Sequence, residues 1–403
     1  MLGFDWWFGV MGFSLVWMLL YFFLTTHFTF ISITLYLHRS LAHRALDLHP
    51  VLCHFFRFIL WMSTGMVTQE WVAVHRKHHA KTETEEDPHS PVIHGLSSIL
   101  FNGVEYYRRA AIDEQTIATY GIGCPNDWVE RNVYAKLTVL GVALLAVIDL
   151  VLFGVVGIVI WALQMMWTPF WAAGVVNGIG HALGYRNFEC ADNAKNIFPV
   201  GLLACGEELH NNHHTYPNSA RFSVKHWEFD LGWQYIRLLA MLKLAKPLHT
   251  GPVVERVNNK AAIDVNTWWA AVNDRFRIMA EFAERVMKPN VRAEQKRANC
   301  HQIKATFRRA NRALCAHEVI LNDHDRTKIV KVTQASPLIQ RLYLLKLRLN
   351  ELWRKRNGST EELLQEFKEW CTDAETSNVR ELNDFVADLK TLTVPQPSYS
   401  HSV

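Results

Sequence analysis

The chain has 403 residues, half of them hydrophobic, and a formal net charge of +4. A charge this small does not indicate a nucleic-acid partner, and we expect none. The seven cysteines show no CxxC spacing, which argues against a disulfide framework and against a thiolate metal site, so we expect free thiols in a reducing compartment.

The first apolar stretch, residues 6–37, contains no Asp, Glu, Lys or Arg. As one helix it would rise about 48 Å, more than the ~30 Å of a bilayer core, whereas a break at Thr25 and Thr26 would leave two pieces too short to span. We therefore predict a single spanning helix over about residues 8–37. The basic residues Arg39 and Arg44 then place its end on the cytoplasmic side.

Residues 48–68 are apolar but are interrupted by Arg57 and two histidines. We predict a buried or membrane-surface helix here, because a crossing would put the histidines before and after it on opposite faces of the membrane. A charged stretch, Lys81 to Asp87, continues this element. Its end is predicted at Asp87-Pro88-His89, since the residue before proline resists the helical conformation.

From Leu137 to Leu183 the only charged residue is Asp149. This length fits two spans, over about residues 137–155 and 158–180, with a turn near 152–157. The turn carries no Lys or Arg, as expected for an outward loop, so both ends of the hairpin should return to the cytoplasm.

The polar region 184–250 then reads as part of a cytoplasmic cap. From residue 261 the pattern changes to apolar residues at helical spacing between charges, as in Leu342 to Leu349. Ser359 and Glu362 have the spacing of a helix-capping box, and the tail from Pro395 should be disordered. The predicted fold is all-α: a membrane domain with a histidine-rich cap over 1–260, and a soluble helical extension over 261–403.

Histidines gather at four places that this topology puts on one face of the membrane. They are His38 and His43; His75, His78 and His79; His181; and His210, His213 and His214. Offsets of three and four residues on a helix lie on one face, so each cluster can aim several imidazoles at one point. Nine imidazoles exceed what one tetrahedral zinc uses, and they suit two metals, for which iron, zinc and copper are all compatible with imidazole.

Carboxylates near these clusters could orient the imidazoles through their second N–H group. The candidates are Glu70, Asp87, Glu207 and Glu208. A histidine-lined metal transporter is the alternative from a different class, although transport would favour ligands at the membrane midplane.

The pattern His38-x4-His43, His75-x2-His78-His79 and His210-x2-His213-His214 resembles the membrane fatty-acyl desaturase family. Asn177-Gly178-x-Gly180-His181 and Asp87-Pro88-His89 are similar to elements of its stearoyl-CoA-desaturase-like branch. The likeness covers about residues 15–235 and is closest to bacterial delta-9 desaturases with a helical C-terminal extension. That family usually has four spans where three are predicted here, so residues 1–10 could be the remnant of a first one.

This resemblance implies that the nine histidines bind two irons and that Asn177 contacts one metal through water. The implied reaction uses dioxygen and electrons to remove two hydrogens from an acyl chain, giving a cis double bond, most often at the ninth carbon. It implies an enzyme of the bacterial inner membrane with its site on the cytoplasmic side. No His-Pro-Gly-Gly haem motif occurs, so electrons should come from a separate ferredoxin-like or flavoprotein partner.

The identity of the acyl carrier stays open at this stage. Animal acyl-CoA enzymes of the family carry an Arg-Asp pair just before the second histidine box, where this chain has Ala73 and Val74. A phospholipid and an acyl-CoA therefore both remain candidate substrates. A hydroxylase with the same metal core is the rival enzyme, and the tunnel for the acyl chain is expected along the 48–68 helix and the ends of the spans.

Overall fold

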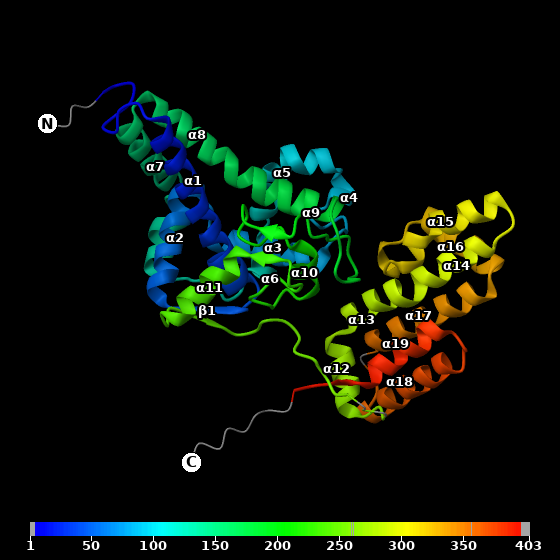
Figure 1. The fold of residues 1–403 in the computed structure, drawn as a ribbon. Helices are drawn as coiled ribbons and strands as arrows, with labels where there is room; N and C mark the ends of the chain where they lie inside the picture. Colours follow the sequence, from blue (N-terminus) through cyan, green and yellow to red (C-terminus); the bar gives the residue numbers. More distant parts are fainter. Residues whose placement is uncertain (1–4, 259, 261, 356, 396–403) are drawn as a thin grey trace, which may run out of the picture. The chain divides into compact units, whose positions relative to one another are not determined.

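The computed structural model describes residues 5–258, 260, 262–355 and 357–395. The chain divides into two compact units (Figure 1). The first comprises Met1–Arg186 and Asp192–Gly251, and the second comprises Asn187–Ala191 and Pro252–Val403. The sequence placed this boundary about ten residues later, between 260 and 261.

The first unit is built from helices with two very short sheets. The helices are α1 (Leu15–Ser32), η1 (Ile33–Ala42), α2 (Pro50–Thr64), α3 (Thr68–Lys81), α4 (Pro91–His94), α5 (Leu96–Ala111), α6 (Glu114–Tyr120), η2 (Glu130–Tyr134), α7 (Thr138–Phe153), α8 (Val155–Pro169), η3 (Phe170–Ile179), α9 (Gly180–Ala182), α10 (His210–Thr215) and α11 (Leu231–Met241). Strand β1 (Leu46–Leu48) pairs antiparallel with β4 (Ala245–Pro247), and β2 (Val200–Gly201) pairs parallel with β3 (Phe229–Asp230).

The first apolar stretch forms one continuous helix over 28 residues, Leu15–Ala42, as α1 followed by η1. The helix begins at residue 15 and not at residue 8 as predicted. Ser14 caps it, since its extended backbone places the hydroxyl where it accepts from the N–H of Trp17. Residues 5–13 instead form turns, with a bridge between Asp5 and Gly9.

Helices α2 and α3 meet at an angle of 87°. Gly65 makes this bend possible: its φ is +62°, and an added Cβ would lie 3.0 Å from the Val142 side chain. Helix α2 packs against α1 and α7, and the bend returns α3 to η1. Helix α3 ends at Lys81, so the charged stretch after it forms turns and is not the helical continuation that the sequence suggested.

The apolar hairpin of α7 and α8 turns at Gly154, inside the predicted interval. Helix α8 continues through η3 and α9 as 28 residues, Val155–Ala182. Helix α7 has 16 residues, about 24 Å, which is less than a ~30 Å bilayer core. Among the described residues, two helices are therefore long and apolar enough to cross a membrane, where the sequence predicted three; the bent pair α2–α3 would be the third if it counts as one broken span.

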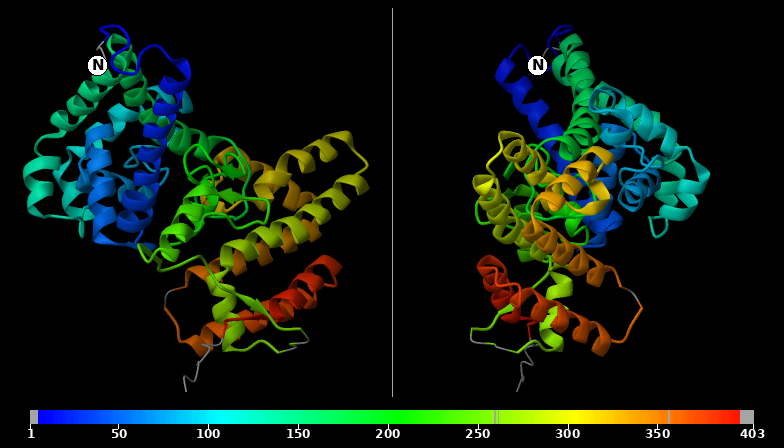
Figure 2. Two further views of the ribbon diagram at one scale, coloured as in Figure 1. Left: turned by 60° about the vertical axis from the view of Figure 1, so that its left-hand side comes forward. Right: turned by 90° about the vertical axis from the view of Figure 1, so that its right-hand side faces the viewer.

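Both long helices contain a π-helical segment, η1 or η3, near the end that lies at the histidine-bearing part of the unit. Figures 1 and 2 show α1 and α8 starting at the same end of the unit and running toward the part that holds α3, α9 and α10. Wider helical turns of this kind often occur at functional sites, because they re-aim the side chains that follow.

The second unit is also helical. Its helices are α12 (Val265–Asn273), α13 (Arg275–Phe282), η4 (Ala283–Met287), α14 (Lys288–Arg297), α15 (His301–Cys315), η5 (Glu318–Ile320), α16 (Asp323–Ala335), α17 (Pro337–Arg354), α18 (Thr360–Glu375) and α19 (Arg380–Lys390). Strands β5 (Glu255–Arg256) and β6 (Leu392–Thr393) pair antiparallel.

The core of the second unit is aromatic, with Phe282, Phe367, Trp370 and Phe385 almost fully buried. The predicted capping box of Ser359 and Glu362 is confirmed at the start of α18. The tail that the sequence assigns to disorder lies, from residue 396 on, outside the described residues.

Candidate metal centre

Four separate elements bring the nine predicted histidines together in two groups. The first group contains His38, His43, His75, His79 and His213, and the second contains His78, His181, His210 and His214. Within each group the potential ligand atoms all lie within 4.8 Å of one another. Each group could therefore hold a metal ion.

Helical periodicity distributes the histidines of α3 and α10 between the groups. His75 and His79 are four residues apart and face the first group, while His78 is turned to the second. On helix α10 the assignment is reversed: His210 and His214 belong to the second group, and His213 belongs to the first. The two groups adjoin, because the rings of His79 and His214 stack with centroids 4.3 Å apart.

The imidazoles point their Nε2 atoms at one another. Four Nε2–Nε2 distances fall between 2.8 and 3.1 Å: His43 to His75, His79 to His213, His38 to His213, and His181 to His210. Two more buried Nε2 atoms, those of His78 and His214, have no hydrogen-bond partner among the described residues. Buried polar atoms seldom remain unsatisfied, and the lone pairs of these two atoms fit coordination of a cation.

Two of the four predicted carboxylates contact imidazoles. The Nδ1–H of His78 donates to Asp87 over 2.8 Å, and that of His38 donates to Glu207 over 2.8 Å. A hydrogen bond at Nδ1 fixes the tautomer and leaves the Nε2 lone pair free to bind a cation.

Two further carboxylates in the same position were missed from the sequence. Glu83 accepts from Nδ1 of His181 at 3.3 Å, and Asp192 accepts from Nδ1 of His214 at 3.2 Å. Glu83 lies in the charged stretch directly after the second histidine box, and this position could have identified it as a candidate. Its φ of +60° is unusual for a non-glycine residue. Asp192 lies in a polar loop with no comparable signal.

The other predicted site residues lie nearby without contacting an imidazole ring through a hydrogen bond in the described part of the chain. Glu208 accepts from the backbone N–H groups of Ala204 and Gly206, so it holds the turn that carries Glu207. Glu70 and Asn177 line the pocket described below.

Burial keeps most of these imidazoles neutral. It lowers the pKa values of His43, His79 and His213 well below the usual range, and neighbouring imidazoles lower them further. Burial also opposes the charged form of His78, but the Asp87 carboxylate outweighs it and raises the pKa of His78. Neutral imidazole is the form that binds metals, so the site is suited to a cation.

Close packing holds the rings in place. Gly180 adjoins His210, and a Cβ there would lie 2.9 Å from Cδ2 of that ring. Next to His38, the fully buried Arg39 pairs with Asp230 at 3.0 Å and donates to the carbonyl of Cys205. This pair anchors the turn that presents Glu207.

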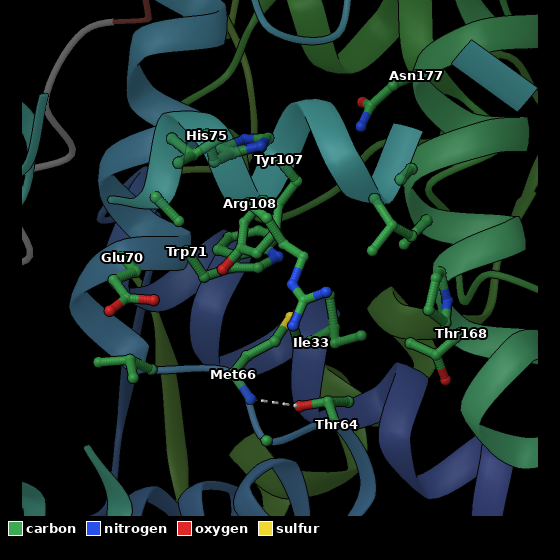
Figure 3. Close-up of a pocket in the computed structure, with 18 of the residues that line it drawn as sticks. Ile33, Thr64, Met66, Glu70, Trp71, His75, Tyr107, Arg108, Thr168 and Asn177 are labelled. Carbon is green, nitrogen blue, oxygen red and sulfur yellow. Dashed lines mark hydrogen bonds between the residues drawn. The ribbon is translucent and has the colours of Figure 1, made fainter. Parts of the chain in front are cut away.

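A pocket of about 570 Å³ leads to the histidines (Figure 3). Its lining is mostly apolar and comes from the 63–67 bend after α2, from α5, and from the ends of the two long helices. The bend and the helix ends lie in segments that were predicted to line a tunnel, whereas α5 was not. His75 and Asn177 lie at one end of the view, and Thr64 and Met66 lie at the other. The exposed residue Arg108 reaches into the pocket from α5.

Comparison with known proteins gives two family matches. A model described as fatty acid desaturase matches residues 6–245, and a model described as transposase matches residues 265–394. The sn-1 stearoyl-lipid 9-desaturase of Synechocystis sp. is 31% identical over 231 residues, which are 57% of this chain and 70% of that protein.

Two other relatives differ in the substrate that their names give. The sn-2 palmitoyl-lipid 9-desaturase of Nostoc sp. is 33% identical over 235 residues, covering 55% of this chain and 78% of that protein. An acyl-CoA 5-desaturase of Anemone leveillei is 31% identical over 217 residues, covering 53% of this chain and 65% of that protein.

Proposed function

Because the chain belongs to the fatty acid desaturase family, we propose that it introduces a cis double bond at the ninth carbon of a long acyl chain. The reaction consumes dioxygen and electrons, and the acyl chain is carried by a membrane phospholipid or by coenzyme A. One observation carries this proposal: an apolar pocket ends at two groups of converging, buried imidazoles.

We assign one iron ion to each histidine group. Adjacent ligands at about 2.1 Å from an octahedral metal are ~3.0 Å apart, which matches the Nε2–Nε2 distances of 2.8 to 3.1 Å. The unpartnered Nε2 atoms of His78 and His214 fit the same assignment. When bound, the irons supply the reduction of dioxygen that gives the oxidant for the acyl chain.

The carboxylates have a supporting role in this proposal. Asp87, Glu207, Glu83 and Asp192 each accept a hydrogen bond from Nδ1 of one histidine and so hold its Nε2 atom toward the metal. Asn177 is uncharged, unlike these carboxylates. We assign it a contact with the metal of the second group through a water molecule. It lies four residues before His181 on the same continuous helix.

The pocket would position the acyl chain and exclude water from it. Its apolar walls fit a hydrocarbon, and holding the chain beside the metals confines oxidation to one pair of carbons. The guanidinium of Arg108 suits a phosphate, and both a phospholipid and coenzyme A carry phosphate groups.

The two long apolar helices support a membrane enzyme. Both end at the histidine groups, so a single face of the membrane would carry the site. We propose that this is the cytoplasmic face of a bacterial inner membrane; the basic residues that follow α1 support the cytoplasmic side. We further propose that electrons come from a separate ferredoxin-like or flavoprotein reductase.

The test is expression in a bacterial host followed by fatty-acid analysis with location of the double bond. We expect more monounsaturated chain with its double bond at the ninth carbon, lost in His78→Ala and His213→Ala and retained in His226→Ala, a matched control at an exposed histidine outside both groups. A hydroxylated product would favour the rival enzyme, and full activity in either of the first two variants would contradict the site.

The acyl carrier is tested with the purified enzyme, a reductase system, and either a phospholipid or an acyl-CoA as the only substrate. Conversion of one and not the other identifies the carrier. Arg108→Gln should raise the KM for that substrate while changing kcat little, because the contact lies away from the reacting carbons. Failure of both substrates with two irons bound would contradict desaturation of either carrier.

A further inference from the structure

Charge is unevenly distributed along the second unit. From Lys288 to Arg312 the sequence has eight basic residues and one acidic residue, Glu294. From Thr360 to Lys390 it has nine acidic residues and three basic residues. Figure 1 shows α14, α15 and α16 together at one end of this unit, with α18 and α19 at the other. The unit therefore has a positive end and a negative end.

The positive end carries what we call the basic face. It consists of seven exposed cations on the packed helices α14 and α15: Arg292, Lys296, Arg297, Lys304, Arg308, Arg309 and Arg312. Within the described part of the chain, Arg297 is the one member that forms an ion pair, with Glu294 at 3.1 Å. The other six charges are not compensated in this way.

Helical spacing makes the cations of α15 into one stripe. Lys304, Arg308 and Arg312 follow one another at intervals of four residues, whereas Phe307 and Leu314 of the same helix are buried in the core. On α14, Arg292 and Lys296 have the same interval. The cations are thus not needed for packing within the unit, and they remain exposed.

We propose that the basic face binds anionic phospholipid headgroups of the membrane with which the desaturase unit associates. The second unit is covalently joined to that unit, so the lipid surface is present at a high effective concentration. An anionic surface would also orient the unit, by attracting its positive end and repelling the negative end. A nucleic acid is the other polyanion that such a face fits, and the transposase match covers the same helices; the tether to a membrane unit favours lipid.

A native probe position lies within the basic face. Cys300 is exposed and directly precedes α15, whereas the other six cysteines are buried or half-buried. The full chain is labelled at Cys300 with a thiol-reactive fluorophore and reconstituted in nanodiscs of neutral phosphatidylcholine, with or without phosphatidylglycerol. Quenching by headgroup-labelled lipid reports contact, and Cys300→Ser measures the background from other thiols.

We expect quenching in the anionic nanodiscs, its absence in neutral ones, and its loss in 1 M salt, where the screening length falls to about 3 Å. Removing three cations in Arg308→Gln/Arg309→Gln/Arg312→Gln should weaken the contact ~100-fold, at about fivefold per charge. The matched control Arg348→Gln/Lys355→Gln/Arg380→Gln removes three exposed cations outside the basic face and should leave quenching unchanged.

Three outcomes would overturn the proposal. They are equal quenching in neutral and anionic nanodiscs, equal loss in both triple variants, and quenching relieved by a mixed-sequence DNA duplex that itself binds the chain. The last would assign the face to nucleic acid. None of these readouts depends on desaturation, so the proposed function can fail separately.

Discussion

Replacement of Asp87 by asparagine should release one metal and keep the other. Asp87 is buried and accepts three hydrogen bonds, from Nδ1 of His78 at 2.8 Å, from the N–H of His89 at 3.0 Å and from the N–H of Glu83 at 2.9 Å. Asparagine has the same shape but exchanges one oxygen for an NH₂ donor. In the amide orientation that keeps more hydrogen bonds, the remaining oxygen accepts from His78 and His89. The NH₂ group then faces the N–H of Glu83, which loses its acceptor.

The magnitude follows from these contacts. One buried donor loses its acceptor, which should destabilise the fold by about 1–3 kcal/mol. Loss of the negative charge beside His78 should lower the affinity of the second group for its metal ~10- to 100-fold, which is the usual effect of losing such a partner. No histidine of the first group donates a hydrogen bond to Asp87, so the affinity of that group for its metal should not change.

The assay is iron content per chain, measured by mass spectrometry after dialysis against increasing concentrations of a chelator. We expect Asp87→Asn to lose one iron at about 10- to 100-fold less chelator than the unmodified protein, while the second iron is released as before. Asp127→Asn is the matched control, because Asp127 pairs with Arg57 away from the histidines. Simultaneous loss of both irons, or retention of both, would refute the assignment of separate sites.

Three further predictions concern the scaffold and the pocket. Arg39→Met leaves Asp230 buried without its partner and should destabilise the first unit by about 3–5 kcal/mol, measured by thermal unfolding. Gly180→Ala places a methyl group 2.9 Å from Cδ2 of His210 and should reduce both iron content and desaturation. Met66→Trp fills the end of the pocket farthest from Asn177 in Figure 3 and should shift the preferred substrates, in product analysis, toward shorter acyl chains.

Matched variants separate these effects from general damage. Arg348→Met breaks an exposed pair with Asp373 and should cost less than about 1 kcal/mol. Gly178→Ala meets the side chains of Ile99, at 3.1 Å, and Leu96, at 3.4 Å, and should be milder than Gly180→Ala. Equal losses within either matched pair, or an unchanged chain-length profile in Met66→Trp, would contradict the corresponding argument.

Helix positions could be read from the sequence where local chemistry decides them. The long charge-free stretch predicts the first long helix, Leu15–Ala42, and Ser359 with Glu362 predicts the start of α18. The predicted helix boundaries were wrong where a specific contact, and not the apolar pattern, decides the end of the helix. The first helix starts at its cap, Ser14, and not where the apolar residues begin, and α3 stops at Lys81 because the residues after it turn back toward Asp87.

The sequence by itself predicted a nitrogen-rich site for more than one metal, because nine histidines lie in four clusters that the predicted topology places on one face of the membrane. Only the tertiary structure decided which histidine serves which group, and it placed Glu83 beside His181 and Asp192 beside His214. Periodicity fixes directions around one helix axis. The meeting of four elements far apart in the chain depends instead on the bend at Gly65 and on how the helices pack.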